Sequence, residues 1–452
     1  MAYLTIGPEE FLQGESPLEY DPKGGFSSIS YGLNLDRVPG VLYFSPSATD
    51  RGSTTLTGKI IASADDQNLS HNDKYFLDEE GAFYRLDGVT FVKRQTAPAG
   101  TFQEGTSDML QFGLVTYATS TDGLWALTGS DLDSLDKTTT LSLTTGYRHP
   151  MERVESEVFI GNKNLIYYFD NAGNTGTAFT LPPEINVTSL RKHPDGRTLL
   201  AFCGTLQDLA HAEGGDGRVY FCNPRTRLWD REVQIATQVE GTRVVGGIVY
   251  ATWGKTFGYF NGNGLVPLKK FLTSGTTYSH AISNMDDIVI TRDGLNVLAF
   301  GDLGSGSVWW RPYRNNTDSN NINCVTYKGS DVLLVGFGDA TTGILHEVDL
   351  STAGTNGILY TKRYYFPQQI KVRRIEVLHT DTSTSRFILA NVATDDAGTV
   401  ATFKDATYTA VTSNKTRVDN PGIVTDILQF RLQPITTGLG FRQIRVHYDP
   451  ID

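Results

Sequence analysis

The 452-residue sequence predicts an all-β protein, in which a β-propeller is followed by a C-terminal β-sandwich. The first observation is a recurring hairpin with an apolar strand, a turn rich in Gly, Asp or Asn, and a second strand. The anchor residues, one per hairpin, are Tyr84, Trp125, Ile166, Val219, Tyr259, Val308 and Leu345, separated by 41, 41, 53, 40, 49 and 37 residues. A period of roughly 40–50 residues without helix is typical of propeller blades. Seven hairpins predict seven blades, or six if one unit belongs to the closure of the ring.

The composition is the second observation. Glycine occurs 46 times and methionine only four times, which fits strands joined by tight turns and disfavours long helices. The formal net charge is −11, and no Lys/Arg cluster has the form of a nucleic-acid-binding surface. The densest basic stretch, Lys362 to Arg374, alternates with apolar residues, so we interpret it as the solvated face of a strand.

The chain divides into three predicted regions. Residues 1–58 contain five prolines and form an irregular lead-in, in which residues 40–44 are one candidate for a strand that closes the ring. Residues 59–360 form the propeller. Residues 361–452 hold further alternating segments without the blade period, which predicts the β-sandwich.

The first blade shows the expected pattern most clearly. Its four strands are predicted at residues 59–63, 74–77, 83–86 and 89–92, with Asp87-Gly88 as a hairpin turn. Three other turns resemble one another, at residues 120–123, 193–196 and 291–294. Each contains Asp-Gly and precedes an apolar strand, and this similarity supports true repetition while indicating no activity.

The cysteine count and the chain start suggest where the protein is made. Cys203, Cys222 and Cys324 are odd in number and lack metal-type spacing, and Cys203 and Cys222 lie in apolar strands, which predicts free buried thiols. No secretory signal is recognised at the start, and no apolar run has the length of a membrane helix. Synthesis in a reducing cytoplasm is therefore expected.

No set of residues predicts an enzyme, so no catalytic, cofactor-binding or metal-binding residue is assigned. Paired carboxylates occur beside predicted turns, where Asp is common for backbone reasons, at residues 65–66, 78–80, 286–287 and 395–396. The eight histidines are scattered, without a metal-binding motif. The aromatic side chains, including Trp309 and Trp310, are interpreted as blade core.

In its layout the chain resembles β-propeller structural proteins of tailed bacteriophage virions, such as tail nozzle and adaptor components. The resemblance rests on the proline-containing lead-in, the uneven blades and the terminal sandwich with its strands at residues 371–378 and 441–448. It implies a non-enzymatic virion protein that forms part of a ring around the DNA path. Its partners would be other tail proteins and copies of itself, with DNA only passing through and no membrane insertion. Residues 203–217 and 312–323, or the sandwich, are candidates for the subunit contacts.

Two other function classes remain open. A glycan-binding or glycan-cleaving propeller would use exposed aromatic residues and loop carboxylates on one face. A cytosolic protein-interaction propeller would use one face as a docking platform.

Overall fold

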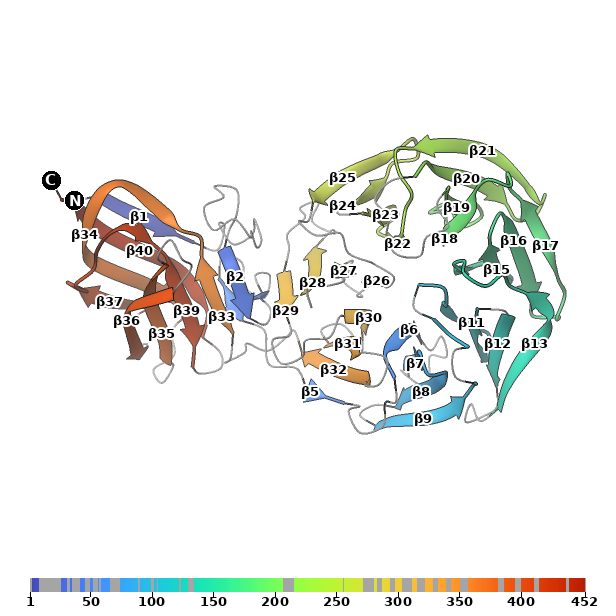
Figure 1. Cartoon of the computed structure of the whole chain (residues 1–452), viewed down its shortest axis with the longest axis horizontal. Coiled ribbons are helices and arrows are strands. Elements are labelled where there is room, and N and C mark those ends of the chain that lie inside the picture. Colours follow the sequence, from blue (N-terminus) through green and yellow to red (C-terminus); the bar gives the residue numbers. More distant parts are fainter. Residues whose placement is uncertain are drawn as a thin grey trace.

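A computed structural model gives the structure of the chain (Figure 1). The residues that it describes are 2–7, 26–30, 33–34, 41–44, 49–51, 56, 58–65, 74–87, 90–98, 101–103, 105–121, 123–128, 134–205, 215–254, 256–270, 280–282, 287–292, 297–302, 311–314, 322–327, 332–338, 343–349, 357–380, 386–394, 400–409, 414–435 and 439–451. These residues contain strands and turns but no helix, so the prediction of an all-β chain is confirmed.

Seven four-stranded antiparallel sheets follow one another around a ring (Figure 1). The first sheet contains β6 (Ile60–Asp65), β7 (Lys74–Asp78), β8 (Ala82–Asp87) and β9 (Thr90–Thr96), and the second contains β10 (Met109–Phe112), β11 (Val115–Thr119), β12 (Gly123–Thr128) and β13 (Ser134–Ser142). The third contains β14 (Met151–Val154), β15 (Glu157–Asn162), β16 (Leu165–Asp170) and β17 (Thr175–Thr180), and the fourth contains β18 (Asn186–Lys192), β19 (Leu199–Gly204), β20 (Gly217–Asn223) and β21 (Leu228–Ile235). The fifth sheet contains β22 (Gly241–Val245), β23 (Ile248–Trp253), β24 (Thr256–Phe260) and β25 (Leu265–Lys270). The sixth contains β26 (His280–Ile282), β27 (Asp287–Arg292), β28 (Val297–Asp302) and β29 (Arg311–Arg314). The seventh contains β30 (Ile322–Tyr327), β31 (Val332–Gly338), β32 (Gly343–Asp349) and β5 (Thr49–Asp50). The first strand of each sheet contacts the first strand of the next, and β30 contacts β6, so these strands surround the centre of a β-propeller.

The sequence period has a simple structural origin. Six of the seven anchors lie on the third strand of their sheet, namely Tyr84, Trp125, Ile166, Val219, Tyr259 and Leu345. Val308 lies outside the described residues, as do Trp309 and Trp310. The third strand is an inner strand of its sheet, and both faces of an inner strand of a blade pack against neighbouring blades, which favours apolar residues.

The strand that closes the ring is β5, and the expectation that residues 40–44 do so is wrong. Asp50 pairs with His346 and Thr49 pairs with Glu347, so β5 is the outermost strand of the seventh sheet. Leu42 instead bridges Phe441, and Tyr43 and Phe44 form β4 (Tyr43–Phe44), which pairs with β3 (Leu33–Asn34). The apolar run at residues 41–44 is buried within the second domain rather than at the seam of the ring.

The second domain is built from both ends of the chain (Figure 1). One sheet contains β1 (Ala2–Ile6), β40 (Phe441–Pro450), β34 (Tyr364–His379), β37 (Lys415–Asp419) and β38 (Val424–Leu428). The other contains β2 (Phe26–Ser30), β33 (Ile358–Thr361), β39 (Phe430–Pro434), β35 (Arg386–Thr394) and β36 (Val400–Thr409). The propeller is therefore inserted into a sandwich. Residues 1–58 are not merely an irregular lead-in, because β1 and β2 belong to the sandwich, and the C-terminal part of the sandwich starts at β33 rather than at residue 361.

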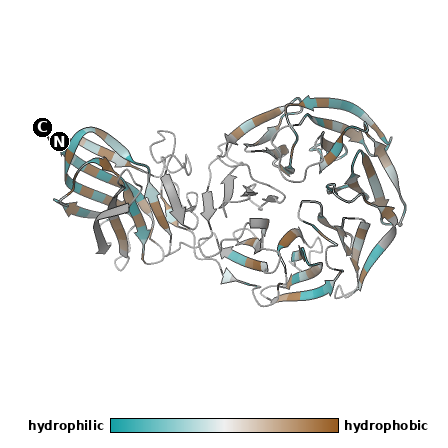
Figure 2. Cartoon of the chain, viewed as in Figure 1, coloured by the Kyte–Doolittle hydropathy of each residue, from teal (hydrophilic) through white to brown (hydrophobic). Residues whose placement is uncertain are grey.

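Hydrophobic and hydrophilic residues alternate along many strands (Figure 2), as expected for strands with one buried face. In the sandwich, Ile6, Val377, Phe387 and Val446 belong to one buried cluster that joins both sheets. Between blades, similar clusters join successive sheets, and Cys203 and Cys222 lie in one of them as free, buried thiols. This confirms the prediction made for these two cysteines.

The three similar Asp-Gly turns stand at different points of their blades. Residues 193–196 join the first and second strands of a sheet, β18 and β19. Residues 120–123 and 291–294 instead precede the third strand, β12 or β28. The shared sequence reflects a shared need for a tight turn, because Gly196 has a φ of 76° and Asp195 accepts hydrogen bonds from the turn.

Candidate ligand-binding pocket

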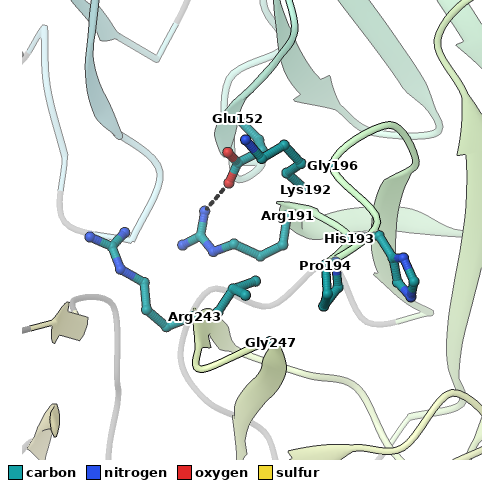
Figure 3. A pocket seen from close by; sticks show the side chains of 9 residues that line it. Glu152, Arg191, Lys192, His193, Pro194, Gly196, Arg243 and Gly247 are labelled. Carbon is teal, nitrogen blue, oxygen red and sulfur yellow. Dashed lines mark hydrogen bonds and ion pairs between the residues drawn. The ribbon is translucent and has the colours of Figure 1, made fainter. Parts of the chain in front are cut away.

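A cavity of about 460 Å³ opens beside the first strands of three successive sheets (Figure 3). Strands β14, β18 and β22 form its walls, together with the turns that follow β18 and β22. Its lining residues are Glu152, Arg191, Lys192, His193, Pro194, Gly196, Arg243, Val244 and Gly247. First strands surround the centre of the ring, so the pocket lies where a propeller can bring distant residues together.

Arg191 is held in place by three different strands. Its Nε donates to the carbonyl of Thr242 at 2.7 Å, and its Nη1 donates to Glu152 Oε2 at 3.2 Å. Nη1 also donates to the carbonyl of Leu190 at 2.8 Å. Beneath it, the hydroxyls of Ser189 and Thr242 lie 2.6 Å apart and align β18 with β22. The guanidinium plane is thus fixed before any ligand arrives.

The turn after β18 forms a rigid rim. Asp195 Oδ1 accepts hydrogen bonds from the N–H groups of Arg197 and Thr198, and its Oδ2 accepts one from the Thr198 hydroxyl. Desolvation raises the pKa of Asp195, but these hydrogen bonds outweigh it, and the pKa falls to about 2. His193 Nδ1 lies 3.1 Å from Asp195 Oδ2, and the His193 ring lies beyond Pro194, away from Arg243 (Figure 3). His193 therefore belongs to the rim.

The electrostatic character of the pocket is opposite to that of the whole chain. Arg191, Lys192 and Arg243 contribute three positive charges, and Glu152 contributes the one carboxylate of the lining that faces them. Arg191 and Arg243 extend from neighbouring strands toward the same space (Figure 3). The one carboxylate among the described lining residues is ion-paired with Arg191.

Buried ionisable groups nearby have structural roles. His149 is fully buried, and its Nδ1 donates to the carbonyl of Gly161 at 3.1 Å. Burial lowers the pKa of His149 to about 4, against weaker opposing effects of the Gly161 and Thr144 backbone. Arg148 donates to the carbonyl of Glu240 at 2.5 Å, linking the segment before β14 to the segment before β22.

The described members of the carboxylate pairs considered from the sequence, Asp65, Asp78, Glu79, Glu80 and Asp287, are not among the lining residues of the pocket. Asp78 is buried and accepts hydrogen bonds from Ala82 N at 2.6 Å and Tyr84 Oη at 2.7 Å, as a turn residue does. Asp66, Asp286, Asp395 and Asp396 lie outside the described residues. Within the described part of the chain, no three His, Cys, Asp or Glu residues are grouped in a way that fits a metal ion. In the same part, no helix is long and apolar enough to cross a membrane.

Sequence reasoning missed Arg191 and Arg243. A signal was present, since the two arginines lie 52 residues apart, close to the longest blade spacing, and each lies on the first strand of its sheet. Single arginines on separate blades form no local motif, so only the ring arrangement brings them together.

No protein-family model matches the chain, and no curated protein matches its sequence. Solved structures show similar folds. A catalytically inactive variant of virginiamycin B lyase from Staphylococcus aureus, solved with quinupristin, has a TM-score of 0.54 and 9% identity over 67% of this chain and 99% of that one. A streptogramin B lyase structure has a TM-score of 0.50 and 10% identity over 67% of this chain and 97% of that one. At such low identity the likeness shows the β-propeller fold alone.

Proposed function

We propose that this chain is a non-enzymatic structural protein that assembles with copies of itself, as a ring-forming component of a bacteriophage tail. The comparisons identify no tail protein, so the proposal of a tail component rests on the layout of the chain, in which a propeller is joined to a sandwich. In this proposal the sandwich makes the contacts between subunits and the propeller is a module that the sandwich carries. DNA passes the ring without sequence-specific contacts.

The outer face of the first sandwich sheet carries the proposal. Tyr3, Tyr365 and Val424 alternate with core residues along β1, β34 and β38, and their side chains are 70%, 54% and 48% exposed. Ile451, directly after β40, is also exposed. Four of the nine large exposed hydrophobic side chains in the described residues thus belong to this sheet or its end. Exposed apolar residues grouped on one element mark interaction surfaces.

Charged residues of both signs lie side by side on the same sheet. Arg374 pairs with Asp419 at 2.9 Å, and Arg373 pairs with Asp449 at 2.8 Å. Glu376 pairs with Lys415 at 2.7 Å. The basic stretch expected to form a solvated strand face is therefore balanced by acids, and this face offers both signs of charge to a different surface of the neighbouring subunit, as a ring requires.

The pocket supports the non-enzymatic part of the proposal. A hydrolase or lyase working by acid–base catalysis needs an acid and a base close to the reacting atoms. In the pocket the single carboxylate is paired with Arg191, and His193 faces the rim. The lining fits ligand binding better than proton transfer.

The test is the mass of the purified protein in solution, with negative-stain images of the same sample. Closed rings are expected for the natural sequence, and Val424→Glu is expected to shift the population toward monomers. Leu228→Glu is the matched control, because Leu228 is equally apolar and 64% exposed but lies on the outer propeller strand β21. Monomers at every soluble concentration contradict the proposal.

A second candidate function, binding of a receptor or other ligand by the propeller, is favoured by the cationic pocket. It is compatible with assembly through the sandwich because the two surfaces belong to different domains.

A further inference from the structure

We propose that the turn between β24 and β25 is a site of spontaneous deamidation, at which Asn261 is converted to aspartate and isoaspartate. The turn has the sequence Asn261-Gly262-Asn263-Gly264, so it contains two consecutive Asn-Gly pairs. The inference concerns the propeller alone and does not depend on the tail assignment.

The reaction uses the chain itself and water. The backbone nitrogen of Gly262 attacks Cγ of Asn261, a new C–N bond forms, and the bond between Cγ and Nδ2 breaks. Nδ2 leaves as ammonia together with the proton that Gly262 N gives up, and a cyclic succinimide remains. Water then opens this ring at either carbonyl, which gives aspartate or isoaspartate. The net change replaces the side-chain NH2 by OH, with no change in oxidation state.

The side-chain carbonyl of Asn261 is polarised for this attack. Its Oδ1 accepts hydrogen bonds from the backbone N–H of Asn263 at 3.0 Å and from that of Gly264 at 2.9 Å. Negative charge develops on Oδ1 when the nitrogen adds to Cγ, and both donors already point at this atom. The turn therefore acts as an oxyanion hole for its own first residue.

The attacking nitrogen of Gly262 is accessible. Its N–H donates to no acceptor among the described residues. Gly262 has a φ of 89°, and no atom lies within 4 Å of a Cβ added to it, so no neighbouring side chain covers this peptide. Asn261 is exposed, which lets water reach the succinimide.

Asn263 is a matched comparison within the same turn. It also precedes a glycine, and its Oδ1 also accepts a hydrogen bond, from Arg231 Nη2 at 2.5 Å. Its potential nucleophile is engaged, however, because Gly264 N donates to Asn261 Oδ1 and Gly264 O accepts from Asn261 N at 3.1 Å. Gly264 N must give up a hydrogen bond before it can attack, so Asn263 is expected to react more slowly than Asn261.

Asn223 is a second comparison, in the turn that precedes β21. Its Oδ1 accepts from the backbone N–H of Arg225 at 3.0 Å and from that of Thr226 at 3.3 Å, as Asn261 Oδ1 does from its own turn. The next residue is Pro224, whose nitrogen carries no hydrogen. The same kind of polarised carbonyl therefore has no nucleophile beside it, and no deamidation is expected at Asn223.

The test is peptide mapping by mass spectrometry after long incubation of the full-length protein at neutral pH, in buffer and in urea. In buffer, Asn261 is expected to deamidate roughly tenfold faster than Asn263, the rate cost of first breaking one hydrogen bond. In urea the turn is absent and both residues precede glycine, so their rates are expected to be alike. Asn223 is expected to remain intact in both samples.

Variants assign the mass change to one residue. Asn261→Gln is expected to abolish the fast reaction in buffer, because attack on a longer side chain must close a larger ring. Asn263→Gln is the matched control, since it keeps the backbone N–H that donates to Asn261 Oδ1 and is expected to retain the fast reaction.

Three results overturn the proposal. They are an Asn261 that stays intact in buffer while the urea sample reacts, equal rates of Asn261 and Asn263 in buffer, and the same excess of Asn261 in urea as in buffer. Ring formation is read from particle mass, so none of these results bears on it.

Discussion

Arg51 and Glu347 form an ion pair with two hydrogen bonds, although 296 residues separate them in the chain. Arg51 Nε lies 3.1 Å from Oε2 of Glu347, and Nη2 lies 3.2 Å from Oε1. The backbone N–H of Arg51 also donates to the carbonyl of Leu345 at 2.8 Å. The pair therefore holds the short strand β5 against β32 at the point where the propeller ring closes.

Arg51→Gln is expected to lower the free energy of unfolding by about 1–2 kcal/mol, because the pair is half-buried and bidentate. Urea unfolding followed by tryptophan fluorescence measures the effect. Arg225→Gln removes an exposed pair with Glu155 and is expected to change the stability by less than about 0.5 kcal/mol. Equal effects of the two substitutions would show that the pair at the seam has no special role.

Gly343→Ala is expected to destabilise the protein by about 1–3 kcal/mol, the range for overpacked sites. A Cβ at Gly343 lies 2.0 Å from the carbonyl oxygen of Gly58 and 2.9 Å from Leu56 Cβ, so the chain entering the first blade must move. Gly264→Ala is the control, because no atom lies within 4 Å of its added Cβ. Thermal unfolding of both variants provides the measurement, and a neutral Gly343→Ala contradicts this packing at the seam.

Stability is expected to fall as the pH decreases from about 6.5 to 4, partly because of His149. The folded state holds the pKa of His149 at about 4, below the ordinary 6.5, so the unfolded chain binds the proton more readily. The contribution of His149 to the free energy of unfolding is fully present above pH 6.5. It is lost as the pH falls toward 4, which lowers the free energy of unfolding by up to roughly 3 kcal/mol.

Urea unfolding of the wild type and of His149→Gln at pH 7 and pH 5 isolates this contribution. The variant is expected to lose less stability between the two pH values. An identical loss in both proteins would assign the pH dependence to carboxylates instead.

The three cysteines are expected to resist thiol reagents in the folded protein. Cys203, Cys222 and Cys324 are all buried and free. Burial raises the pKa of Cys222 to about 12 and that of Cys203 well above its ordinary value, which removes the reactive thiolate at neutral pH. Ellman's reagent should detect no thiol before unfolding and three in urea; rapid modification of the folded chain contradicts the burial.

Much of the propeller could be predicted from the sequence because one strand in each blade has a strong pattern. The third strands carry six of the anchors, and the four strands predicted for the first blade agree with β6 to β9 within a few residues. The ring closure could not be predicted, since β5 has only two residues, Thr49 and Asp50, and its partner lies about 300 residues away. The more apolar run at residues 41–44 fits a closing strand equally well by pattern, yet it is buried in the sandwich.

The pocket could not be predicted for a related reason. Its residues come from the strands and turns of three blades, and none of them forms a motif with its neighbours in the sequence. Thr242 contributes its backbone carbonyl oxygen, which accepts a hydrogen bond from Arg191. Because every residue has a backbone carbonyl, the sequence does not indicate this contact. Function in a propeller thus depends on the alignment of first strands around the ring.

The measurement that most directly tests self-assembly through the sandwich is the particle mass of the full-length protein, compared with Val424→Glu and Leu228→Glu. The proposal predicts closed rings for the wild type and for Leu228→Glu, and mostly monomers for Val424→Glu. A wild-type protein that stays monomeric at every soluble concentration, or rings that tolerate Val424→Glu, would contradict assembly through this face.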